Sequence, residues 1–369
     1  MIFRSFFTSL AVLVIVALNI QPVRAQNASL SELEGYAANG DVGAMYNLGL
    51  RFYKGRGVAK DYIKAKEWYS KAADNGYIDA FYALGVMYAN GEGVAKDYNK
   101  AKAWYEGAAI GGNSSAMNNL GLIYQKGSGV QQNYKQAIYW YERGVVADNG
   151  DSMYNLGILY QHGRGVSQDL IRAKTLFEGA ATKGIADAMY NLGVFYFSGI
   201  GVQPDYNLAK EWFEKAIAGG DNAALYNLGV LYSQGLGVKQ DYNQARLLYE
   251  RAASAGNAMA MYNLGVLYHQ GQGVAQDFKL ARQWYERIAS TGNAMVNAEG
   301  LRNLGALYYL GHGVAQNYSQ AKTLFEQAAA SGHKGAMNAL GSLYEQGHGV
   351  PKDSKKATEW YRRAASVKE

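Results

Sequence analysis

One row of acidic residues has the residue type that acid–base catalysis needs. It recurs at a fixed spacing and consists of Asp61, Asp97, Asn133, Asp169, Asp205, Asp241, Asp277, Asn317 and Asp353. General acid–base chemistry requires a carboxyl group, and the amide of an asparagine cannot replace it. A helix N-cap requires only a short side chain with an acceptor oxygen. The exchange of Asp for Asn therefore predicts that this row caps helices.

The histidines form no catalytic or metal-binding motif. The five are His162, His269, His312, His333 and His348, and no two of them lie four residues apart. His312 and His348 fill the middle of Gly-x-Gly turns, where Arg, Glu, Ser, Ile, Leu and Gln also occur. We therefore expect them to face solvent in turns rather than to bind a metal.

Other nucleophile and nucleotide motifs are also absent from the sequence. There is no cysteine, and no Gly-x-Ser-x-Gly elbow holds a serine nucleophile. The Gly-x-Gly-Val turns follow expected helices and lack the lysine of a phosphate-binding loop. The sequence predicts a protein that is not an enzyme and has no cofactor and no metal site.

Composition restricts the partners. The 369 residues carry a net charge of +6, and no run of five basic residues occurs, so we expect no nucleic-acid partner. Aromatic residues make up 13% of the chain, which argues against disorder. The chain is long enough for two ordinary domains or for one repetitive one.

A period of 36 residues organises the chain. Leu-Gly begins at Leu48, Leu84, Leu120, Leu156, Leu192, Leu228, Leu264, Leu304 and Leu340, always 36 residues apart except for 40 before Leu304. Within a repeat, apolar residues at helical spacing precede a Gly-x-Gly-Val turn and follow it, whereas no run alternates with period two. The pattern predicts nine helix–turn–helix repeats without strands, which must stack to bury their apolar faces.

Two further rows have a packing explanation. The glycine of Leu-Gly lets a neighbouring helix approach closely, and the glycines of Gly-x-Gly can take the positive φ that a tight turn needs. An alanine row in the second helices is the expected contact for the Leu-Gly glycine. It consists of Ala65, Ala101, Ala137, Ala173, Ala209, Ala245, Ala281, Ala321 and Ala357.

The sequence ends differ from the repeats. Residues 1–25 combine Arg4, an apolar run and small residues before a cut after Ala25, which predicts a cleaved signal peptide and export to the periplasm or beyond the cell. No later stretch is apolar enough for a membrane span. Residues 26–40 predict a lone capping helix. The solenoid is expected over 41–369, with repeats starting near 41, 77, 113, 149, 185, 221, 257, 293 and 333, and no second domain.

The repeat pattern resembles the Sel1-like repeat family. The second repeat matches through Ala80, Leu84-Gly85, Tyr88, Gly91, Gly93-Val94, Asp97, Ala101-Lys102, Trp104-Tyr105 and Ala108-Ala109, and the likeness covers about residues 41–366. This family is related to the tetratricopeptide repeats. The resemblance implies an all-α fold, a right-handed superhelical solenoid of helix pairs, and an adaptor role in assembling protein complexes. Exported bacterial members are often linked to envelope function or host-cell contact.

The same resemblance places a binding groove on the first helix of each repeat. In the first repeat the positions are Gly43, Tyr46, Asn47, Leu50, Tyr53 and Lys54. Two rows precede Leu-Gly: a tyrosine row, broken at Asn118, Arg302 and Asn338, and an asparagine row, broken at Ala83 and Ala339. The candidate partner-binding residues are Tyr46, Asn47, Tyr82, Asn119, Tyr154, Asn155, Tyr190, Asn191, Tyr226, Asn227, Tyr262, Asn263 and Asn303.

Each row has two interpretations. Asparagine is mildly unfavourable inside a helix, so its recurrence in this row indicates a structural or functional role. The amides can pair with an extended peptide backbone, or they can bond the neighbouring repeat while the tyrosines pack between helices. The variable row, Tyr53, Ala89, Gln125, Gln161, Phe197, Ser233, His269, Tyr309 and Glu345, offers sites for specificity. For the four-residue insertion within Asn293–Gly300 we consider three outcomes: a bend in the stack of repeats, a projecting loop, or a change of length that the fold tolerates.

Two functions follow. The first is an exported scaffold that binds a protein or peptide partner through its concave face. The alternative is an envelope factor that recognises cell-wall peptidoglycan, with or without weak hydrolase activity, because tyrosine rings stack on sugars as well as on peptides.

Overall fold

A computed structural model of the chain describes residues 28–288 and 294–367. The signal peptide predicted for residues 1–25 lies outside these ranges. The chain divides into two compact units, Met1–Ser167 and Gln168–Glu369. The expectation of one continuous right-handed solenoid concerns how these units are placed relative to one another and stays a prediction.

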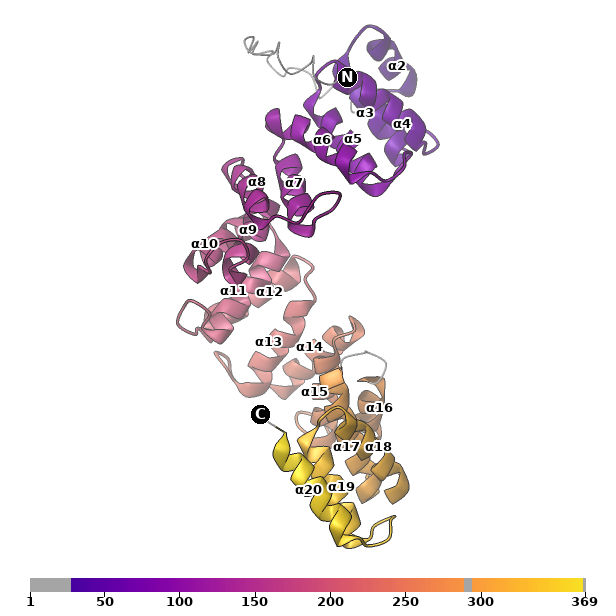
Figure 1. The fold of residues 1–369 in the computed structure, drawn as a ribbon, viewed down its shortest axis with the longest axis vertical. Coiled ribbons are helices and arrows are strands. Elements are labelled where there is room, and N and C mark those ends of the chain that lie inside the picture. Colours follow the sequence, from indigo (N-terminus) through magenta and orange to yellow (C-terminus); the bar gives the residue numbers. More distant parts are fainter. Residues whose placement is uncertain (1–27, 289–293, 368–369) are drawn as a thin grey trace. The chain divides into compact units, whose positions relative to one another are not determined.

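The described residues form nineteen α-helices and no strand, which confirms the all-α repeat fold (Figure 1). A short helix, α2 (Leu30–Ala38), comes first. The first helices of the repeats are α3 (Val42–Lys54), α5 (Ile78–Asn90), α7 (Ser114–Lys126), α9 (Gly150–His162), α11 (Ala186–Ser198), α13 (Ala223–Gln234), α15 (Ala258–Gln270), α17 (Ala294–Leu310) and α19 (Lys334–Gln346). The second helices are α4 (Tyr62–Asp74), α6 (Tyr98–Ile110), α8 (Tyr134–Val146), α10 (Leu170–Thr182), α12 (Tyr206–Ala218), α14 (Tyr242–Ser254), α16 (Phe278–Ile288), α18 (Tyr318–Ala330) and α20 (Ser354–Ser366).

Capping side chains set where the second helices begin. Asp61 Oδ1 accepts hydrogen bonds from the backbone N–H groups of Ile63 and Lys64, both at 3.0 Å. Asn133 does the same for Gln136 at 3.1 Å. The predicted capping role of the Asp/Asn row is therefore confirmed, because the carboxylate and the amide make equivalent bonds. First helices end at a glycine with positive φ, such as Gly55 at +68°.

An aromatic ring fills the space left by each Leu-Gly glycine whose surroundings the structure describes. A methyl group on Gly193 would lie 2.5 Å from Cδ1 of Phe213, and one on Gly49 would meet Cδ1 of Tyr69 at the same distance. The atoms nearest to these glycines belong to the ring and not to the alanine row that was expected there. The alanine lies one turn before the ring and is itself buried, as Ala209 is. The missing side chain makes room for a large planar group rather than a small one.

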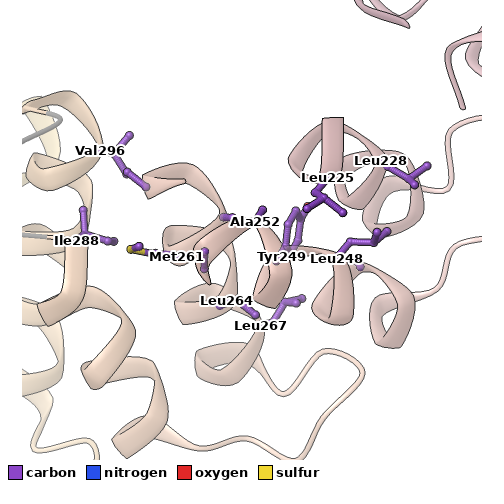
Figure 2. Packing of buried hydrophobic residues seen from close by; sticks show 14 of the residues in the cluster. Leu225, Leu228, Leu248, Tyr249, Ala252, Met261, Leu264, Leu267, Ile288 and Val296 are labelled. Atoms are coloured by element: carbon purple, nitrogen blue, oxygen red, sulfur yellow. The ribbon is translucent and has the colours of Figure 1, made fainter. Parts of the chain in front are cut away.

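In the second unit, a hydrophobic core from α12 to α18 runs through successive repeats, and a further cluster lies in α17 to α20. The core includes Leu225 of α13, Tyr249 of α14, Met261 of α15 and Ile288 of α16, as Figure 2 shows. Each helix pair therefore shares its buried surface with the next pair. Such sharing is what makes a stack of repeats stable when one alone is not.

The N-terminal helix and the insertion both have a defined structure. α2 begins at a capping box formed by Ser29 and Glu32, and it packs Leu33 and Ala37 against α3. In the eighth repeat, residues 294–297 extend α17 to 17 residues, whereas most other first helices have 13. These residues therefore form about one additional helical turn and not a loop.

Candidate protein-interaction face

The predicted site residues lie on one side of the first helices. The tyrosine and asparagine rows are half-buried from Tyr46 to Asn263, and Asn303 is buried, with 8% of its surface exposed. Their exposed fraction is therefore limited, and much of each side chain packs within the protein. Whether they contact a partner stays a prediction.

The tyrosines pack against the aromatic rings of the second helices. The ring centroids of Tyr190 and Phe213 are 6.1 Å apart, and those of Tyr226 and Tyr249 are 6.0 Å apart. Burial, helped by the nearby Asp79 carboxylate, raises the pKa of Tyr46 to about 12. The Tyr46 hydroxyl therefore stays protonated near neutral pH and can act as a hydrogen-bond donor or acceptor.

The asparagines link neighbouring repeats. Asn227 Nδ2 donates to the hydroxyl of Tyr190 at 3.3 Å, and Asn303 Nδ2 donates to Tyr262 at 3.5 Å. In the first unit, where the tyrosine row is broken, Asn155 Nδ2 donates instead to Asn118 Oδ1 at 2.9 Å. For these residues the structure supports the interpretation that the amide bonds the preceding repeat. Each of these amide groups therefore donates one hydrogen bond within the protein.

A third row lies one turn beyond the tyrosines. It is aliphatic in most repeats and consists of Leu50, Val86, Leu122, Ile158, Val194, Val230, Val266, Ala306 and Ser342, all half-buried. Sequence reasoning named only Leu50 of this row. Together with the tyrosine row and the variable row, at helical spacings of four and three residues, it forms a stripe on each first helix. We call this stripe the first-helix face.

The variable row meets the turn of the next repeat. Tyr53 donates to Glu92 Oε2 at 2.6 Å, and Glu92 is the middle residue of a Gly-x-Gly turn. At the other end, the His348 ring stacks on Tyr318 with centroids 4.8 Å apart, and its Nδ1 lies 2.8 Å from the Tyr309 hydroxyl.

The expectation that His312 and His348 face solvent in turns was therefore wrong. Both are half-buried, and the His312 ring stacks on Phe278 at 4.4 Å. The middle residue of the Gly-x-Gly turn, here His312 or His348, packs on the aromatic residue at the start of the preceding repeat's second helix, Phe278 or Tyr318. Within the described ranges, no group of three or more His, Asp or Glu residues is arranged to hold a metal ion.

A family model for the Sel1 repeat matches nine segments of the chain. They are residues 42–77, 78–113, 114–145, 150–185, 186–221, 222–257, 258–293, 298–333 and 335–366. The chain belongs to the Sel1 repeat family. Sel1 repeat proteins generally mediate protein–protein interaction.

Solved structures of Sel1 repeat proteins are similar to this one. One is a protective antigen present in uropathogenic Escherichia coli strains, with 32% identity, a TM-score of 0.77, and coverage of 92% of this chain and 79% of that one. Another, from Oxalobacter formigenes, has 32% identity, a TM-score of 0.59, and coverage of 66% and 98%. No curated protein matches the chain. None of the described helices combines the length and the apolar character that crossing a bilayer demands.

Proposed function

We propose that this protein is an exported scaffold that binds a segment of another polypeptide along its first-helix face. The observation that carries the proposal is the stripe itself. Tyrosine, aliphatic and variable side chains recur there half-buried, which leaves apolar surface within reach of a partner. Aromatic residues are enriched where proteins bind one another, because they add contact area at a low entropic cost.

The ladder of asparagine and tyrosine supports a fixed binding surface. Bonds such as Asn227 to Tyr190 hold adjacent first helices in register. A surface that is already ordered loses less conformational entropy when a partner binds. Variation at Ser233, His269 and Tyr309 on this constant frame supplies a chemistry that differs from repeat to repeat.

A polypeptide fits this face better than a glycan. Sugar recognition by tyrosine uses an open ring face, whereas Tyr190 and Tyr226 tilt against the rings of Phe213 and Tyr249. Binding to cell-wall material is therefore an alternative outcome of the test rather than a second proposal.

Export is part of the proposal. It rests on the signal-like pattern of residues 1–25, and the E. coli relative is described as a protective antigen, which supports an exposed location. Mass spectrometry of protein recovered outside the cytoplasm tests it. The expected N-terminal residue is Gln26, and a cytoplasmic protein that keeps Met1 contradicts export.

Photo-crosslinking tests the binding face. A photoreactive residue replaces Ser233 or Ala306 on the first-helix face, and Gln283 or Thr323 on exposed positions of second helices as matched controls. In cells of the source organism, we expect covalent adducts to polypeptides from Ser233 and Ala306 and few from the controls. Adducts to glycan, or equal polypeptide adducts from all four positions, contradict the proposed face.

A further inference from the structure

The first-helix face changes character along the second unit. On α11 and α13 the stripe presents apolar side chains such as Tyr190, Val194 and Val230, and Tyr262 and Val266 continue it on α15. On α17 the tyrosine position holds Arg302, which is exposed. Arg302 is the one basic residue among the tyrosine, asparagine and aliphatic rows of this unit, all of whose members are described.

Arg302 is held in place, and its guanidinium keeps hydrogen-bond donors that the described residues do not use. Its Nη1 donates to Asn303 Oδ1 at 2.8 Å, and Asn303 in turn donates to the hydroxyl of Tyr262. Among the described residues it forms no ion pair. The carboxylate one turn earlier, Glu299, has its Oε1 3.1 Å from His333 Nε2 on the next repeat instead. The guanidinium therefore sits beside an apolar surface with donors to spare.

We infer that α13, α15 and α17 bind a polypeptide segment in which an aromatic or aliphatic residue lies a few residues away from an acidic one, whose carboxylate pairs with Arg302. This inference rests on the proposed binding function and adds the chemistry of the partner. Arginine pairs with a carboxylate through two parallel hydrogen bonds. A charge at the edge of an apolar contact contributes mainly to specificity and to the association rate.

The helix spacing sets the distance between the two partner residues. Packed helices lie about 10 Å apart, and an extended chain advances about 3.3 Å per residue. In the partner, the acidic residue is therefore expected roughly three residues from the side chain that contacts Tyr262 and Val266. It is expected roughly six residues from the side chain that contacts Tyr226 and Val230.

Selection from a random peptide display library tests this inference with the purified full chain. We expect the enriched peptides to combine an apolar residue with Asp or Glu at that separation. Arg302→Glu is expected to weaken the binding of a selected acidic peptide by about tenfold or more, and binding to the unchanged chain is expected to fall as salt rises. Arg302→Gln, which keeps a donor to Asn303, is expected to give an intermediate loss. A peptide with Lys in place of the acid is expected to bind the Arg302→Glu chain better than the acidic peptide does.

Two failures are distinguishable. If no peptide is enriched on the unchanged chain, the proposed binding function and this inference both fail. If peptides are enriched but show no acidic preference, or bind the Arg302→Glu chain equally well, only the inference fails. Arg251→Glu, an exposed charge reversal on α14, is the matched control, and an equal loss there also overturns the inference.

Discussion

Gly144 of α8 approaches Ser152 of α9, at two positions that alanine occupies in most other repeats, such as Ala108 and Ala116. A methyl group on Gly144 would lie closest to the hydroxyl oxygen of Ser152 and 2.6 Å from its Cβ, so the glycine lets the serine fit. The Ser152 hydroxyl is fully buried and has no hydrogen-bond partner in the described chain. The two departures from the repeat compensate one another sterically.

We predict that Gly144→Ala destabilises the protein by about 1–3 kcal/mol, because the added methyl overpacks the α8–α9 contact. Ser152→Ala is expected to be neutral or to stabilise by up to about 1 kcal/mol, since it removes an unpaired buried hydroxyl. Urea unfolding of both single variants and of the double variant measures the coupling. The double variant, which restores the usual alanine pair, is expected to recover part of the loss, and strict additivity contradicts the steric account.

A second prediction concerns the ring beside each Leu-Gly glycine. Gly193→Ala is expected to cost about 1–3 kcal/mol, because its Cβ would meet the rigid ring of Phe213. Gly35→Ala is the matched control, because Gly35 lies within helix α2 with no atom within 4 Å of the added methyl. Thermal unfolding of Gly35→Ala is expected to show a gain of about 0.5–1 kcal/mol. Equal losses at both sites would show that the ring is not the cause.

A third prediction separates stability from binding in the asparagine row. Asn227→Ala removes the bond to Tyr190 between repeats and is expected to cost about 1 kcal/mol. Asn207→Ala, at an exposed position of α12, is the control and is expected to change stability little. Calorimetric melting is measured beside the affinity for a selected peptide. An affinity loss with unchanged melting would assign Asn227 to the partner instead.

A fourth prediction tests whether the acidic row acts through charge. Asp241 Oδ1 caps α14 by accepting from the N–H groups of Asn243 and Gln244. Asp241→Asn is expected to retain most of the stability, whereas Asp241→Ala is expected to lose about 1 kcal/mol. Denaturant midpoints decide between them, and equal losses in both variants would indicate that the carboxylate charge matters.

A fifth prediction follows from the buried tyrosines. Burial raises the pKa of Tyr46 from 10.0 to about 12. Unfolding exposes the phenol, which then ionises near pH 10, so the unfolded state releases protons first. The stabilising contribution is complete below pH 10 and is lost as pH rises toward about 12. The urea midpoint of unfolding is expected to fall as pH rises through 10, and to fall less steeply in Tyr46→Phe. An identical dependence of the midpoint on pH in both proteins would exclude Tyr46 as a contributor.

Much of the fold could be predicted because each repeat carries its own local signals. Asp61 marks a helix start, and Gly55 with Gly57 marks a turn, each readable within a few residues. The contact of Gly193 with Phe213 joins residues twenty apart on different helices, and no local pattern reports it. The partner of Asn227, Tyr190, lies a repeat away. The rows were therefore visible in the sequence, whereas the contacts that they make between helices and between repeats became visible only in the structure.

The extended α17 shows how such a chain can change length. Four extra residues turn an α-helix by slightly more than a full circle, so the side of α17 that faces its neighbours keeps nearly the same direction. A two-residue insertion between Ala298 and Leu304 would instead turn Ala298 by about 200° away from the buried side that Leu304 and Leu307 occupy. Insertions and deletions within the helices of such repeat proteins are thus expected to come in multiples of about one helical turn, roughly three or four residues.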